Sequence, residues 1–118
     1  MKKVSMFFSR SVMDAVRSEP RLAIQFANAT DLLQRVVAYL GTGRDCEFER
    51  IFHFWSPFGK TDPSIRAEFK ELLEKGFSGA HRIEAYFRFF PGAEMGFTLS
   101  SYLRGEKEAH DRFDFQLG

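Results

Sequence analysis

Residues 81–103 of the chain, HRIEAYFRFFPGAEMGFTLSSYL, decide its fold. Apolar and polar side chains alternate on both sides of residues 91–93, which is typical of two one-faced strands joined by a tight turn. The apolar residues have odd numbers on both strands, so odd must pair with odd to keep them on one side of the sheet. A three-residue loop at 91–93 predicts Phe87 opposite Phe97 and Phe89 opposite Met95 on the apolar side, and Arg82 opposite Tyr102 and Tyr86 opposite Thr98 on the polar side.

The segments that flank this hairpin add a strand and a helix. After a polar loop, residues 113–117 alternate again and predict a final short strand. Before the hairpin, Asp62 and Pro63 open a helix, because aspartate caps free N–H groups and proline tolerates the first helical position. The helix is expected to end at Gly76.

Residues 45–55, DCEFERIFHFW, are interpreted as a further strand, because they are rich in aromatic residues and lie between Gly43 and Pro57. The alternation is imperfect, since both faces of such a strand carry apolar and charged groups. The face expected in the core holds Phe48, Phe52 and Phe54, with Arg50 among them, and the opposite face holds Glu47, Glu49, Ile51, His53 and Trp55.

The first third of the chain predicts a strand followed by helices. Residues 3–8 alternate as a short strand, and Ser11 is the expected N-cap of the helix that follows. Pro20 either interrupts that helix or begins the next one. Apolar spacings of three and four predict one helix or two over residues 20–40, with a short strand over 23–26 as the less favoured alternative.

The expected fold is therefore α+β, a single compact domain spanning residues 1–118. We expect a mainly antiparallel sheet of about five strands, with two to three helices packed on one face. A chain of 118 residues is long enough to bury a core without disulfides or metal. The 15 phenylalanines exceed what one core of this size needs, so some are expected at an interface.

Charge and cysteine content exclude several classes of protein. Lys and Arg total 17 against 16 Asp and Glu, so no net field holds a polyanion over the whole molecule. The single cysteine, Cys46, favours a reducing, cytoplasmic location. No apolar segment approaches the length of a membrane span, so no membrane partner is expected.

No motif for a metal, cofactor or catalytic centre is recognisable. His53, His81 and His110 lie far apart, and the spacing from Cys46 to His53 matches no common zinc site. His53 would share a strand face with Glu47 and Glu49, but no nucleophile accompanies them. We therefore expect no cofactor, no metal and no enzymatic activity, and rank a small enzyme centred on His53 third among the functional hypotheses.

The polar side of the late strands is the main candidate for binding. Protein interfaces favour Arg and Tyr at their energetic centres, and sheets also hold single-stranded nucleic acid with arginine and aromatic side chains. A solvated face with cross-strand pairs is the plain alternative. The predicted interface consists of Arg82, Tyr86, Arg88, Tyr102, Arg104 and Arg112, joined by Trp55 and Phe58 if those two are exposed.

The leading functional hypothesis is a small protein-binding module. One form would be an inhibitor, carried by a phage or plasmid, that occludes a site on a host macromolecular complex. The alternative is a protein that binds single-stranded nucleic acid, RNA in particular, through the same face. The expected partner is a protein, and a homodimer is left open.

Overall fold

The structure is a computed structural model, and it describes residues 3–55, 63–92 and 94–116. The expected α+β fold is confirmed, with four helices and one four-stranded sheet in place of two to three helices and about five strands. The elements, in chain order, are β1 (Lys3–Phe8), α1 (Arg10–Ser18), α2 (Pro20–Thr42), α3 (Asp45–Trp55), α4 (Pro63–Phe77), β2 (Arg82–Phe90), β3 (Glu94–Tyr102) and β4 (Asp111–Gln116).

The register predicted for the central hairpin is confirmed at each of its four pairs. Phe87 lies opposite Phe97 and Phe89 opposite Met95, while Arg82 lies opposite Tyr102 and Tyr86 opposite Thr98. The turn uses Gly92 at a φ of 94°, which favours glycine. The final strand is also confirmed, and it pairs with β3 in antiparallel fashion. Leu103, expected in the core, follows the end of β3 and is exposed.

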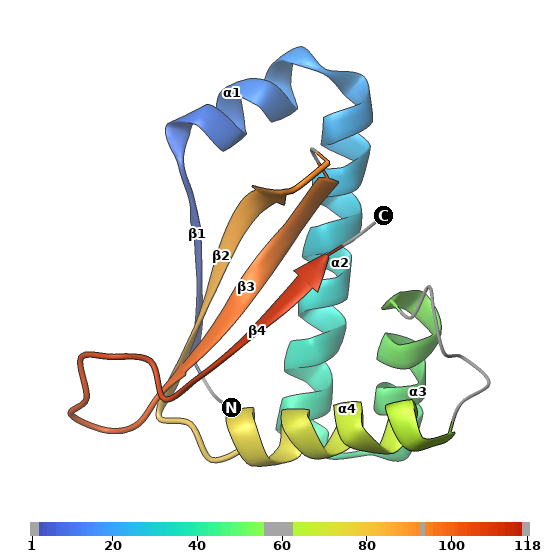
Figure 1. Ribbon diagram of the computed structural model, residues 1–118, viewed down its shortest axis with the longest axis vertical. Coiled ribbons are helices and arrows are strands. Elements are labelled where there is room, and N and C mark those ends of the chain that lie inside the picture. The colour runs from blue at the N-terminus through green and yellow to red at the C-terminus, as the bar shows by residue number, and fades with distance from the viewer. Residues whose placement is uncertain (1–2, 56–62, 93, 117–118) are drawn as a thin grey trace.

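β1 completes the sheet by pairing with β2 in parallel, so the strand order is β1-β2-β3-β4. All four helices lie in the connection between these two strands. In Figure 1 the helices lie to one side of the sheet, and α2 runs along it from end to end. On the strands of the hairpin, six odd-numbered side chains are buried against this helical layer, and Phe89 is partly buried. The six are Ile83, Ala85, Phe87, Met95, Phe97 and Leu99.

α1 and α2 form a helical pair, and their caps differ in part from expectation. Ser9, not Ser11, is the N-cap of α1, because its side-chain oxygen accepts the Val12 N–H at 3.2 Å. Pro20 begins α2, which continues without a break to Thr42. Thr30 starts no new helix, because its hydroxyl donates to the Phe26 carbonyl one turn earlier at 2.9 Å.

The strand expected over residues 45–55 is wrong, since this segment is helix α3. Phe48, Ile51 and Phe52 follow one another at spacings of three and one, which gathers them on one side of a helix. All three are buried, whereas Ile51 was expected on the outward face of a strand. The side chain of Phe54, also expected in the core, is outside the described residues.

α4 begins at Pro63 as expected and ends at Phe77, one residue beyond Gly76. The predicted cap, Asp62, is outside the described residues. On its buried side Phe69 contacts the ring of Phe48 from α3, with ring centroids 5.8 Å apart. α3 and α4 therefore close the core at the end of α2 that lies far from α1 (Figure 1).

One buried hydroxyl makes folding sensitive to alkaline pH. Tyr39 in α2 is 1% exposed and donates to the Oε1 atom of Glu74 in α4 at 2.7 Å. Burial first, and then the hydrogen bond and charge of Glu74, raise the pKa of Tyr39 above its ordinary value of 10.0. A raised pKa in the folded state stabilises the protein below pH 10, and this stabilisation is lost as the pH rises towards the folded value.

Tyr39→Phe tests this linkage. At pH 8 the variant should be about 1 kcal/mol less stable, because it lacks the hydrogen bond to Glu74. Above pH 10 the wild type should lose about 1 kcal/mol more per pH unit than the variant, so the difference should close by about pH 11. Urea unfolding between pH 8 and pH 11 measures both curves, and a difference that stays constant with pH would contradict the assignment.

Candidate functional site

The side of the sheet opposite the helices is called here the outer face. On β2, β3 and β4 it is formed by even-numbered residues, and on β1 by odd-numbered ones. Five of the six predicted Arg and Tyr residues lie on its strands, and Arg104 lies in the loop after β3. Phe58 and the side chain of Trp55 are outside the described residues. Among the side chains that the structure describes, the outer face comprises Ser5, Phe7, Arg82, Glu84, Tyr86, Arg88, Phe90, Thr98, Ser100, Tyr102, Arg112, Asp114 and Gln116.

Glu84 is the centre of a hydrogen-bonded network on this face. It accepts from Arg82 Nε at 3.2 Å and from the Tyr86 hydroxyl. Burial raises the pKa of Glu84, but hydrogen bonds from Tyr86, Tyr102 and Arg82 outweigh burial and leave that pKa below its ordinary value. The same hydrogen bond, followed by burial, raises the pKa of Tyr86. At neutral pH the face therefore presents an ionised carboxylate that is held by Tyr86, Tyr102 and Arg82.

Two aromatic rings of the outer face are covered by the protein's own arginines. The Arg82 guanidinium lies 3.9 Å from the ring centroid of Tyr102, and the Arg88 guanidinium lies 4.7 Å from that of Phe90. Tyr102 is only 8% exposed and Phe90 only 7%. These cation–π contacts hold the arginines flat on the sheet, so their charges are presented in defined positions.

The exposed aromatic surface is a stacked pair at the β1 side. Phe7 and Tyr86 have ring centroids 5.0 Å apart and planes 16° from parallel, and they are 41% and 39% exposed. Phe7 was absent from the predicted interface, because the parallel pairing that places it opposite Tyr86 joins segments far apart in the chain. The sequence did contain one indication: in the alternation of residues 3–8, Phe7 falls on the side of the strand opposite to Val4, Met6 and Phe8, and so away from the predicted core.

A shallow depression of about 590 Å³ lies between this pair and β4. Ser100, only 3% exposed, is one of its lining residues, and Thr98 on the same lining donates to Asp114 at 2.6 Å. A second depression of about 480 Å³ begins at Tyr86 and Arg88 and extends past Phe7 to the start of α1. The first is lined by Tyr86, Arg88, Thr98, Ser100, Tyr102, Arg112, Phe113 and Asp114.

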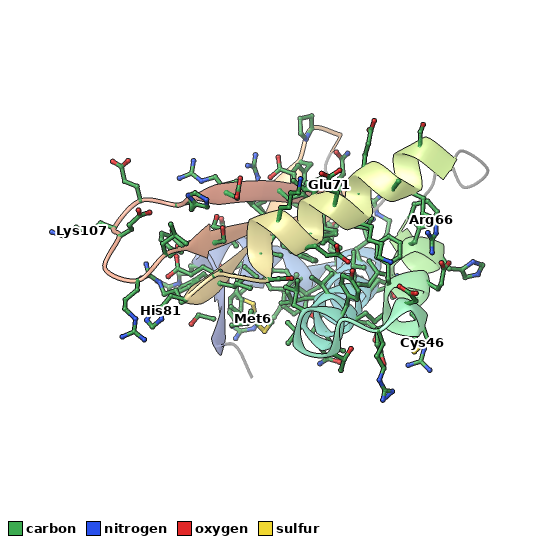
Figure 2. All side chains as sticks on the ribbon, turned by 90° about the horizontal axis from the view of Figure 1, so that it is seen from below. Met6, Cys46, Arg66, Glu71, His81 and Lys107 are labelled. Atoms are coloured by element: carbon green, nitrogen blue, oxygen red, sulfur yellow. The ribbon has the colours of Figure 1, made fainter. Side chains whose placement is uncertain are left out.

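The histidines do not form a site within the described residues. His53, His81 and His110 are all exposed, and no group of three His, Cys, Asp or Glu side chains there is arranged to hold a metal ion. Cys46 and His81 lie at opposite ends of the molecule in Figure 2. The shared strand face expected for Glu47, Glu49 and His53 is wrong, because α3 is a helix in which Glu49 pairs with Arg66 of α4.

Comparison with protein-family models, with curated proteins and with solved structures finds no match to the chain. The function proposed below therefore rests on the residues of the outer face. Across the described parts of the chain, no helix combines the length and the apolar character that crossing a membrane requires.

Proposed function

We propose that this protein is a protein-binding module and that the outer face is its contact surface. The observation that carries the proposal is the network in which Arg82 covers Tyr102 while Glu84 accepts from Arg82 and Tyr86. Ordering long side chains at an interface costs about 0.5–1.5 kcal/mol each, and side chains already held in place avoid much of that cost. The exposed pair of Phe7 and Tyr86 beside this network supplies the kind of apolar anchor that protein partners bury.

A protein partner fits this face better than single-stranded nucleic acid. Base stacking needs open aromatic faces, but the rings of Tyr102 and Phe90 lie beneath arginines. Phe7 and Tyr86 each have one ring face covered by the other, which leaves a single exposed pair where a strand of bases needs several platforms. Among the charged side chains of the face that the structure describes, three arginines stand against Glu84 and Asp114, a weak field for a polyanion. Exposed aromatic residues beside arginines match the composition of protein interfaces, in which Tyr, Phe and Arg are enriched.

The finer form of the proposal is an inhibitor that occludes a site on a macromolecular complex, as a phage or plasmid protein would. The lone thiol of Cys46 is consistent with action in the reducing cytoplasm. The polar depression around Ser100 would then receive a hydrogen-bonding side chain of the partner, because its walls offer both donors and acceptors.

The test is capture of a partner by the immobilised wild-type chain, compared with the double variant Arg88→Glu/Arg112→Glu. Both arginines are exposed on the outer face, so reversing their charge should weaken binding at least tenfold while the fold is kept. Arg82 is left unchanged, since its loss would remove a hydrogen bond from Glu84 as well as uncover Tyr102. Loss of Arg88 uncovers the Phe90 ring, so circular dichroism and urea unfolding of the double variant check that its fold is kept. The readout is the dissociation constant of the captured protein, measured by titration with each variant.

The matched control reverses two exposed arginines of the helical layer, Arg17→Glu/Arg21→Glu. Its net charge equals that of the outer-face variant, so unchanged binding would show that position, not total charge, matters. Equal weakening by both variants would contradict the proposal. Binding to a mixed-sequence single-stranded RNA, lost steeply between about 50 and 200 mM salt and dependent on Arg88 and Arg112, would instead favour the nucleic-acid alternative.

A further inference from the structure

β1 is an edge strand of the sheet, with one side left unpaired by the described strands. In Figure 1 it lies at the outer margin of the sheet, and no described strand lies beyond it on the side away from β2. Met6, Phe7 and Phe8 in succession are 43%, 41% and 45% exposed, although they come from both sides of the strand. Figure 2 likewise places Met6 towards the margin of the molecule. Such an edge offers unpaired backbone groups together with apolar side chains.

The two edge strands of the sheet, β1 and β4, differ in the charge of their side chains, and charge is what protects an edge strand from pairing with another strand. β4, at the other margin, carries Asp111, Arg112 and Asp114, and charged side chains are the usual protection of an edge strand. Asp111 is also close to α4, since a Cβ atom on Gly76 would lie 3.4 Å from its carboxylate. β1 carries no charge from Val4 to Phe8. β1 has a lysine at its first position, Lys3, so among the described strands it is the edge segment from Val4 to Phe8 that lacks this protection.

We propose that β1 pairs in antiparallel fashion with β1 of a second copy of this chain. A two-fold axis perpendicular to the sheet would join the two four-stranded sheets into one continuous sheet. The helices of both copies would then lie on the same side, and the two outer faces would be continuous. This dimer uses the edge of the sheet and leaves the depression around Ser100 open for the partner proposed above, although it brings Phe7 next to Ser5 of the second copy.

The register follows from the symmetry and from the alternation. Residues that face each other must lie on the same side of the sheet, so even numbers pair with even ones. With Met6 on the two-fold axis, Val4 meets Phe8 on the helical side and Ser5 meets Phe7 on the outer side. This register alone pairs the uncharged segment entirely with itself.

Moving the two-fold axis from Met6 to either neighbouring residue breaks the pairing of the uncharged segment with itself. With Ser5 on the axis, Lys3 would face Phe7, and Phe8 would be left without an apolar partner. With Phe7 on the axis, Val4 would face Arg10, which already belongs to α1. The strand is therefore complementary to a second copy of itself, which is the reason for choosing that occupant over an unrelated strand.

The first test is the mass in solution of the wild-type chain and of Met6→Lys. At about 100 μM, sedimentation equilibrium should give twice the 13.7 kDa of one chain, since a dimer with a Kd of about 1 μM is nearly complete there. Met6→Lys places two like charges opposite each other on the axis and should raise the Kd at least tenfold. Circular dichroism confirms that the variant is folded, as expected for so exposed a side chain.

Ile24→Lys is the matched control, because Ile24 is an apolar side chain, 64% exposed, on α2. It should dimerise like the wild type. A wild-type chain that stays monomeric overturns the proposal, and so does a dimer that both lysine variants weaken equally.

The second test fixes the register and does not depend on Met6→Lys. In a Cys46→Ser background, Met6→Cys should form a disulfide between copies, since facing Cα atoms lie about 4.5–5.5 Å apart, within disulfide range. Phe8→Cys is the control, because Phe8 lies on the same side of the strand as Met6 and is about as exposed. In the proposed register it faces Val4 of the second copy, so the two cysteine side chains at position 8 would be four residues, or about 14 Å, apart along the strand. Cross-linking at position 6 and not at 8 supports the register; equal cross-linking at both, or at neither, overturns it.

Discussion

Replacing Gly96 with alanine is expected to destabilise the protein by about 3 kcal/mol, because the position has no room for a side chain. Gly96 lies in β3 opposite Gln116 of β4. A Cβ atom there would lie 2.1 Å from the Phe115 carbonyl oxygen and 2.7 Å from the Phe90 ring. The nearer contact is with backbone, so relief requires β4 to move away from β3.

Urea unfolding of Gly96→Ala and of the wild type measures this effect. Gly41→Ala is the matched control, since Gly41 lies near the end of α2 and a Cβ atom there would contact nothing within 4 Å. That change should be neutral or stabilise the protein by up to about 1 kcal/mol, because alanine favours helix over glycine. A loss below about 0.5 kcal/mol for Gly96→Ala would mean that β3 and β4 are not so closely apposed.

Phe48→Ala is expected to cost about 3–5 kcal/mol, the usual range when a buried phenylalanine is truncated. Phe48 is fully buried where α2, α3 and α4 meet. Its ring lies 5.4 Å from that of Tyr39 and 5.8 Å from that of Phe69, and the Arg66 guanidinium lies 5.0 Å from its centroid. Its removal would leave a cavity shared by three helices.

Alanine substitutions at Arg50 and Ile51 test whether residues 45–55 form a helix or a strand. In α3, Ile51 is fully buried and Arg50 is exposed, so Ile51→Ala should cost about 2–4 kcal/mol and Arg50→Ala less than about 0.5 kcal/mol. A strand would place Arg50 on the buried side beside Phe48 and turn Ile51 outward. Thermal or urea unfolding of the three variants distinguishes the two arrangements, and a costly Arg50 with a neutral Ile51 would contradict the helix.

The hairpin of β2 and β3 could be predicted in detail because its determinants are local. Alternation selects the buried side, and the loop around Gly92 fixes which residues face each other. The same alternation is sufficient to place Arg82, Tyr86, Arg88 and Tyr102 on one face of the sheet. The cover of Tyr102 by Arg82 was not predictable, because it depends on side-chain conformations across two strands.

Residues 45–55 show the opposite case. Their apolar residues satisfy a period of two through Phe48 and Phe52, and a helical period through Phe48 and Ile51. In a segment of this length, the local preferences of the residues do not decide between a strand and a helix. Contacts with Tyr39 of α2 and Phe69 of α4 favour the helix, since only a helix turns Phe48, Ile51 and Phe52 to the same side.

Alternation, caps and turns act between near neighbours, so they were enough to predict the α+β class, the helical character of residues 20–40, the hairpin register and most of the outer face. They left open whether residues 20–40 form one helix or two, and the structure has one. Only the tertiary structure decided the helix at 45–55 and the parallel pairing of β1 with β2. That pairing joins segments separated by all four helices, and no turn sets its register. It therefore also decided that Phe7 stacks on Tyr86 and that β1 is left as the open margin of the sheet.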